Sequence, residues 1–141
     1  MTERPTLDDF PLHISIPVRY SDTDRQGHVN NAVFATYLEV ARVAFFHDPA
    51  FPLNEPGTSF VLAHLSIDYR NEILWPNTVQ VGTGVLSVGR SSMRLRQYIF
   101  VAGTLAATAE TVCVQTNDAT RSSQPISDAA RERLATVTMP G

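Results

Sequence analysis

The stretch AVFATYLEVARVAFFH, from Ala32 to His47, contains neither glycine nor proline. Apolar residues fall on every side of the helix that this stretch would form, and the polar exceptions before the final His47 are Thr36, Glu39 and Arg42. A helix that is apolar all round is typically buried rather than laid on a surface. The three prolines between Asp48 and Gly57 prevent its continuation. The stretch therefore predicts one buried helix followed by a loop.

The segments on either side of the helix predict β-strands, because apolar and polar residues alternate along them. The first strand is predicted over 12–20, and its Pro17 suits an edge of a sheet, since proline donates no ladder hydrogen bond. The expected inward face of this strand consists of Leu12, Ile14, Ile16, Val18 and Tyr20. The strand beginning at Thr58 is expected to place Val61, Ala63, Leu65, Ile67 and Tyr69 on one face.

Three further strands are predicted over 78–88, 91–101 and 104–116. Their short connections, Gly89-Arg90 and Ala102-Gly103, are typical of antiparallel hairpins. A short terminal helix is predicted over 126–137.

The order of strand, helix and four strands predicts an α+β protein, with a five-stranded antiparallel sheet wrapped around one long central helix. A chain of 141 residues fits one domain, with a core at about 12–117 and a tail at 118–141. One such sheet covers only part of a helix that is apolar all round. Burial alone therefore predicts association of two copies.

Composition excludes several classes of protein. A net charge of −3 argues against a nucleic-acid binder, which usually carries a basic stripe. Met1–Phe10 lacks the apolar run of a signal peptide, and no stretch approaches the roughly 18 apolar residues of a membrane span. Cys113 is the single cysteine, which suits a reducing compartment. We expect a cytoplasmic protein with no membrane partner, and no spacing predicts a metal site or a cofactor.

The link between the first strand and the helix, YSDTDRQGHVNN from Tyr20 to Asn31, is rich in reactive groups. It places two carboxylates, an imidazole and three carboxamides next to a helix N-terminus. Such a terminus offers unpaired N–H groups that can stabilise an oxyanion. A nearby carboxylate can activate water or attack a carbonyl itself. The segment therefore predicts a hydrolase site without a serine triad.

The same segment resembles a known family. The pattern Tyr20-x-Asp22-x-Asp24-x-x-Gly27-His28-Val29-Asn30-Asn31, followed by Tyr37 and Glu39-x-Ala41-Arg42, is similar to the 4-hydroxybenzoyl-CoA thioesterase family of hot-dog proteins. The run from His28 to Asn31 is especially similar to long-chain acyl-CoA thioesterases and plant acyl-carrier-protein thioesterases. Ile67-Asp68-Tyr69 and the turn Val88-Gly89-Arg90-Ser91-Ser92 also fit, so the resemblance covers roughly residues 12–117.

The resemblance implies an acyl-CoA thioesterase in which Asp24 is the catalytic carboxylate, as base or as nucleophile. It implies that the backbone N–H of Asn31 polarises the thioester carbonyl. It further implies a homodimer or homotetramer with sites at subunit interfaces, coenzyme A held by surface basic residues, and an acyl chain beside the helix. His28 either orients water or substrate, or only hydrogen-bonds the loop.

Arg90, Ser91 and Tyr37 are the candidate substrate-binding residues. Arg90 and Ser91 stand at a hairpin turn where a coenzyme A phosphate can bind, and Tyr37 belongs to the family pattern. Some relatives carry tyrosine where this chain has Phe34, which leaves both aromatic and aliphatic acyl groups open. Arg70, Arg94, Arg96 and Arg121 are further candidates for a phosphate contact.

Several neighbouring residues have structural interpretations instead. We expect Asp22 to accept hydrogen bonds in a turn, and Asn30 to cap the helix. Glu39 and Arg42, three residues apart on the helix, predict an ion pair. Cys113, on a strand, is expected to serve packing.

Three functions stay open at this point. The leading one is hydrolysis of an acyl-CoA to a free acid and coenzyme A. The second is hydrolysis of an acyl group from an acyl carrier protein, which predicts a basic docking patch. The third is a binding module for acyl-CoA without catalysis.

Overall fold

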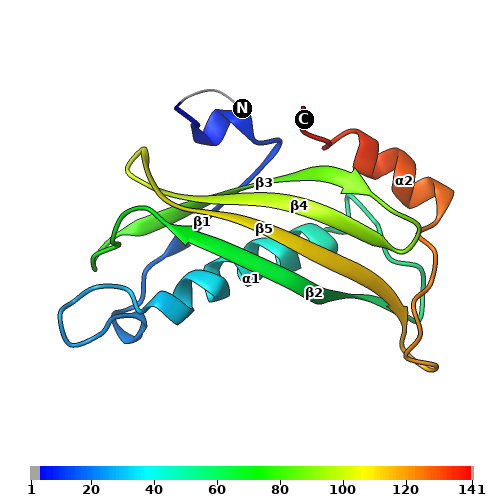
Figure 1. The fold of residues 1–141 in the computed structure, drawn as a ribbon, viewed down its shortest axis with the longest axis horizontal. Coiled ribbons are helices and arrows are strands. Elements are labelled where there is room, and N and C mark those ends of the chain that lie inside the picture. The colour runs from blue at the N-terminus through cyan, green and yellow to red at the C-terminus, as the bar shows by residue number, and fades with distance from the viewer. Residues whose placement is uncertain (1–3, 141) are drawn as a thin grey trace.

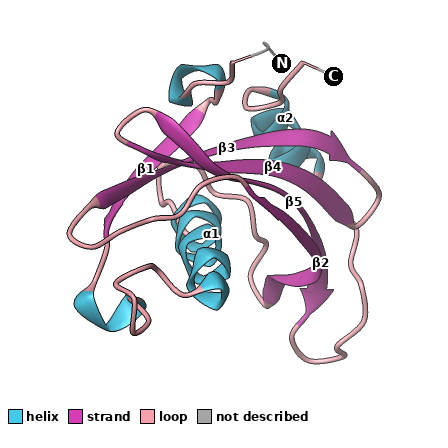
Figure 2. Cartoon of the chain, turned by 60° about the vertical axis from the view of Figure 1, so that its left-hand side comes forward, coloured by secondary structure: helices cyan, strands magenta, loops and turns pink. Residues whose placement is uncertain are grey.

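A computed structural model of the chain describes residues 4–140. The strands β1 (Leu12–Pro17), β3 (Thr78–Val88), β4 (Ser92–Val101), β5 (Thr104–Asn117) and β2 (Thr58–Tyr69) form one sheet in this spatial order. Every neighbouring pair is antiparallel. The sheet curves around α1 (Asn31–Phe46), with β1 on one side of the helix and β2 on the other (Figures 1 and 2).

The predicted architecture is confirmed, because five antiparallel strands wrap around one long helix as in the hot-dog fold. The strands and helices after the first strand begin and end within about two residues of their predicted limits. Pro17 ends β1, which is an edge strand of the sheet. The terminal helix α2 spans Asp128–Ala135.

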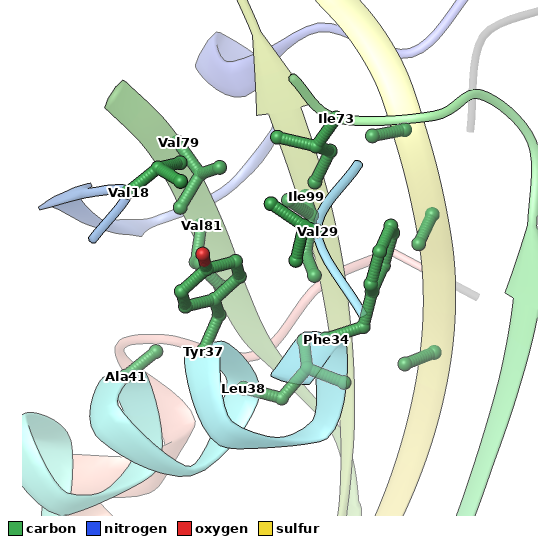
Figure 3. Packing of buried hydrophobic residues seen from close by; sticks show 13 residues of the cluster. Val18, Val29, Phe34, Tyr37, Leu38, Ala41, Ile73, Val79, Val81 and Ile99 are labelled. Atoms are coloured by element: carbon green, nitrogen blue, oxygen red, sulfur yellow. The ribbon is translucent and has the colours of Figure 1, made fainter. Parts of the chain in front are cut away.

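The core lies between the sheet and the inner face of α1. Figure 3 shows side chains from the helix and from the sheet directed into the same space. The buried members of this cluster include Val18, Val29, Phe34, Tyr37, Leu38, Ala41, Ile73, Val79, Val81 and Ile99. The outer face of α1 is different, since the side chain of Val43 is 50% exposed. The prediction of a helix buried on every side is therefore wrong for the single chain, because one sheet covers one side only.

The first strand is shorter than its alternation suggests. After Val18 the chain turns into a short 3-10 helix, Tyr20–Asp22, and the side chain of Tyr20 is 74% exposed. The turn forms because the Asp22 carboxylate accepts hydrogen bonds from the backbone and the guanidinium of Arg19. Tyr20 was expected on the inward face, and that expectation is wrong.

Strand β2 contains a β-bulge at Ala63, because Leu62 pairs with Cys113 while His64 pairs with Val112. An extra residue reverses the alternation of the strand beyond it. Leu62 therefore shares the helix-facing side with Leu65, whereas Val61 faces away. The expectation that Val61 shares a face with Leu65 is wrong for this reason.

At the end of the sheet away from the start of α1, the chain packs α2 and the residues after it against the strands. Leu134 of α2 is fully buried in a cluster with Phe45 of α1 and Leu95 of β4. The residues after α2 then run beside β3, since Val85 donates to the Val137 carbonyl at 3.0 Å and accepts from the Met139 N–H at 2.7 Å. None of the helices within residues 4–140 is long and apolar enough to cross a membrane.

Candidate active site

The link between β1 and α1 is clamped against the segment that follows β2. His28 forms a β-bridge with Leu74, and the Val29 N–H donates to the Ile73 carbonyl at 2.7 Å. Within the link, the Asp24 N–H donates to the His28 carbonyl at 2.8 Å. Gly27 has a φ of +80°, a conformation that glycine adopts without strain. These bonds fix the backbone that carries the reactive side chains.

Asp24 is held by one carboxylate oxygen and open at the other. Its Oδ1 accepts the N–H of Gln26 at 2.9 Å and the N–H of His28 at 3.2 Å. Among residues 4–140, nothing donates a hydrogen bond to Oδ2. The side chain is exposed, so Oδ2 is available to a bound water or substrate.

The first turn of α1 leaves one backbone donor open. Asn30 caps the helix as predicted, since its side chain accepts the Ala32 N–H and its carbonyl accepts the Val33 N–H, both at 2.9 Å. The Asn31 N–H has no acceptor within the described part of the chain. The Tyr69 hydroxyl donates to the Asn31 carbonyl at 2.9 Å, which ties the start of the helix to the end of β2.

A pocket of about 420 Å³ brings these groups together. Its lining consists of Asp24, Gln26, His28, Val29, Asn31, Phe34, Tyr69, Arg70, Asn71 and Glu72. The three predicted catalytic residues thus share one pocket at the N-terminal end of α1. Asp24, which has a free carboxylate oxygen, and Asn31, which has a free N–H, therefore line one open space, and these are the two kinds of group that can act on a carbonyl under attack by water.

Glu72 is a pocket residue that the sequence did not reveal. Its carboxylate oxygen Oε2 lies 2.9 Å from Nε2 of His28. Glu72 follows the end of β2, where no periodic pattern applies, so only the bridge between His28 and Leu74 brings it to the pocket. Tyr69 and Phe34 form the apolar wall, with ring centroids 4.9 Å apart.

Tyr37, predicted to bind substrate, lies in the core and does not line this pocket. Its hydroxyl donates to the Asp22 carboxylate at 2.9 Å. Asp22 is 1% exposed and structural, as expected. Burial raises the pKa of Asp22, but the hydrogen bonds from Arg19 and Tyr37 outweigh burial and hold the pKa below its ordinary value. Burial and the Asp22 carboxylate raise the pKa of Tyr37.

Arg90 and Ser91, the other predicted substrate-binding residues, lie at the turn between β3 and β4. The Arg131 guanidinium donates to the Gly89 carbonyl at 2.8 Å and to the Arg90 carbonyl at 2.9 Å, which fixes this turn beside α2. In Figure 1 the turn lies near α2, at the opposite end of the sheet from the start of α1. Within one chain, therefore, these two residues do not reach the pocket of Asp24.

The predicted ion pair between Glu39 and Arg42 does not form within residues 4–140, so this expectation is wrong. Glu39 is exposed, whereas Arg42 is only 5% exposed and donates to Oε1 of Gln97 at 3.2 Å. Burial lowers the pKa of Arg42. Burial raises the pKa of Cys113 to about 11, so the cysteine stays a neutral thiol in the core.

A second cavity, of about 220 Å³, lies between β1 and the C-terminal half of α1. It is walled mainly by apolar residues, among them Ile14, Ala41 and Phe45. Its His13 is engaged through Nε2 by the Phe10 carbonyl at 2.7 Å. No helix N-terminus lines this cavity, so it lacks a backbone donor like the Asn31 N–H of the first pocket. Among residues 4–140, no group of three or more His, Cys, Asp or Glu side chains is placed to hold a metal ion.

Comparisons with known proteins identify the family of the chain. The family model of the thioesterase-like superfamily matches residues 18–134. The uncharacterized protein YsmA of Bacillus subtilis is 28% identical over 61% of this chain, and the match covers 58% of YsmA, little more than half its length.

Two solved structures are similar over nearly their whole length. A thioesterase from Thermus thermophilus, solved in complex with coenzyme A and Zn, is 32% identical, with a TM-score of 0.78 and coverage of 92% of this chain and 96% of that one. The PA5185 protein from Pseudomonas aeruginosa has a TM-score of 0.86 at 21% identity, covering 98% of this chain and 99% of that one, which supports the fold alone. The chain belongs to the thioesterase-like superfamily, and its fold is the hot-dog fold.

Proposed function

We propose that this protein hydrolyses an acyl-CoA thioester to a free carboxylic acid and coenzyme A. The observation that carries the proposal is the pair of open groups on one pocket, the Asp24 Oδ2 atom and the Asn31 N–H. A carboxylate oxygen without structural hydrogen bonds has its lone pairs free to take a proton from water, and Oδ2 of Asp24 is such an oxygen.

The chemistry follows from these two groups. Asp24 takes a proton from a water molecule while the water oxygen attacks the thioester carbonyl carbon. The carbonyl oxygen becomes an oxyanion that the Asn31 N–H stabilises, and one such donor is worth roughly a hundredfold to a thousandfold in rate. The C–S bond then breaks, the acyl group leaves as the acid, and the coenzyme A thiolate takes the proton back from Asp24 and leaves as the thiol. If Asp24 attacks instead, an anhydride forms first and water then hydrolyses it.

Coenzyme A is the proposed carrier because the similar Thermus thermophilus thioesterase was solved in complex with it. Arg90 and Ser91 are proposed to meet its phosphates across a subunit interface. β2 is an edge strand with Val61 and Leu62 exposed, so a second copy can add its own β2 there. A twofold axis through the middle of β2 exchanges the two ends of the sheet. It would bring the Arg90 turn of each copy toward the pocket of the other.

The test is release of free thiol from aromatic and aliphatic acyl-CoAs, and from an acyl carrier protein, by wild type and by Asp24→Asn. The asparagine keeps an oxygen for the Gln26 and His28 N–H groups, so the loop is preserved. We expect turnover to fall by at least about 100-fold, because the base is lost. The matched control is Asp48→Asn, an exposed aspartate that accepts the Ala50 N–H in a similar turn outside the pocket.

Three results would change the proposal. Turnover by Asp24→Asn equal to wild type would remove Asp24 from the chemistry. Hydrolysis of the carrier-protein substrate alone would replace coenzyme A as the carrier. Binding of acyl-CoA without thiol release by wild type would favour a binding module.

A further inference from the structure

We propose that Glu72 is a positioning residue for the thioester hydrolysis proposed above, and that it acts by fixing the ring of His28. Oε2 of Glu72 lies 2.9 Å from Nε2 of His28, and both residues line the pocket that contains Asp24. A carboxylate only accepts hydrogen bonds at this contact when it is ionised, so Nε2 of His28 carries the proton. In the neutral ring the other nitrogen, Nδ1, is then an acceptor.

In this tautomer, Nδ1 can accept a hydrogen bond from a water molecule near Asp24. Nδ1 is bonded to the ring carbon that joins Cβ, so it is the ring nitrogen closer to the backbone. The backbone N–H of His28 is already within 3.2 Å of the Asp24 carboxylate. A water molecule that donates one hydrogen to Nδ1 and the other to Oδ2 of Asp24 would have its lone pairs directed away from both. Such a water is oriented for attack on a carbonyl bound at Asn31.

The contact between Glu72 and His28 can fix the His28 ring because hydrogen bonds hold the backbone on both sides of the contact. Before Glu72, the N–H groups of Arg70 and Asn71 donate to the Ala106 carbonyl at 2.8 and 3.1 Å. After Glu72, the side chain of Ile73 is buried and its carbonyl accepts the Val29 N–H. His28 is held on its side by the bridge to Leu74. The charged residues that share the pocket with this pair are Asp24 and Arg70.

A purely structural role would leave a different signature. The side chains of His28 and Glu72 are 37% and 60% exposed, and an ion pair this exposed adds little to folding stability. Loss of Glu72 should therefore leave the melting temperature nearly unchanged. A positioning role instead predicts a lower kcat with an unchanged KM, because water is oriented only for the reacting complex.

The experiment compares Glu72→Ala, Glu72→Gln and Glu72→Asp with wild type, using acyl-CoA turnover and ¹⁵N NMR of the His28 ring. We expect kcat to fall roughly tenfold or more in Glu72→Ala, and Glu72→Asp to recover part of the loss. In wild type the NMR spectrum should show a protonated Nε2 and an unprotonated Nδ1, and in Glu72→Ala a mixture of tautomers. The control is Glu110→Gln, which breaks the ion pair with Arg94 elsewhere on the sheet, with no expected change.

The double variant His28→Ala/Glu72→Ala separates the two roles. If Glu72 acts through His28, removing Glu72 from the His28→Ala protein has no further effect. Wild-type kcat in Glu72→Ala, a protonated Nδ1 in wild type, or additive losses in the double variant would each overturn the positioning role. If those results accompany a large loss in Asp24→Asn, thioester hydrolysis itself stands. If wild type releases no thiol from any thioester, both proposals fall.

Discussion

The two ends of α1 are held in place by different interactions. At the N-terminal end, hydrogen bonds between backbone groups and a few polar side chains fix the chain, as at the Asn30 cap and the bridge between His28 and Leu74. At the C-terminal end, apolar side chains do so, and the Phe45 ring lies 5.8 Å from the Phe51 ring, centroid to centroid. Leu134 of α2 completes that cluster.

The difference shows how one helix can serve both chemistry and stability. A pocket that admits water and a charged substrate cannot be filled with apolar side chains, so its geometry must come from directional hydrogen bonds. At the apolar end, the buried Phe45 ring adds to the burial that keeps the helix on the sheet. Substitutions at the two ends should therefore affect separate properties.

The largest expected effect on stability is at the apolar end. Phe45→Ala should lower the free energy of unfolding by about 3–5 kcal/mol, because it removes a buried ring and leaves a cavity. Urea unfolding measures this change, and the kcat of the folded enzyme should stay close to wild type. Val43→Ala is the matched control on the same helix, since Val43 is half exposed. A larger loss in Val43→Ala than in Phe45→Ala would contradict the comparison.

A smaller, pH-dependent effect is expected at Asp22, beneath the polar end. Its pKa lies below the ordinary value of about 3.9, so its ionised form stabilises the folded protein above about pH 4, and this contribution is lost as pH falls toward the folded pKa. Asp22→Asn should therefore be less stable than wild type at pH 6, by about 1–3 kcal/mol, and the gap should narrow at pH 3. Urea unfolding at both pH values tests this, and a gap of constant size would count against it.

The smallest expected effect is at the helix cap. Asn30→Ala removes the acceptor of the Ala32 N–H and should cost about 1 kcal/mol in stability. Asn30→Asp keeps an acceptor at the same place and should stay close to wild type. Thermal unfolding of the two variants side by side measures the difference. Equal melting temperatures would show that the cap does not hold this end of the helix.

The sequence predicted the fold well where periodicity is continuous. The helix, the two hairpins among β3, β4 and β5, and the Asn30 cap all follow from local patterns. The prediction from alternating residues was wrong at two places. In β2, the extra residue Ala63 reverses which side chains face the helix. After β1, the hydrogen bonds between Arg19 and Asp22 end the strand early. The bulge and the early end of the strand leave the order of apolar and polar residues unchanged. A prediction from that order therefore detects neither of them.

For the candidate site, one contiguous segment was sufficient to predict that Asp24, His28 and Asn31 lie together. Glu72 and Tyr69 come from a distant segment, and only the bridge to Leu74 and the hydrogen bond from Tyr69 to Asn31 bring them there. Tyr37 has surroundings that the family pattern did not predict. A tyrosine inside a family pattern suggested contact with substrate, but a buried Asp22 carboxylate requires a donor, and the hydroxyl of Tyr37 provides it.

The bulge at Ala63 allows one strand, β2, to contact both ends of α1. A bulge increases the local twist of its strand, so the two halves of β2 can follow the curved surface of α1 in different directions. On one side of Ala63, the Phe60 ring stacks on Phe46, with centroids 4.9 Å apart. On the other side, Tyr69 binds the first residue of the helix. Deleting Ala63 would remove the bulge and straighten β2. One half of the strand would then lose its contacts with the helix.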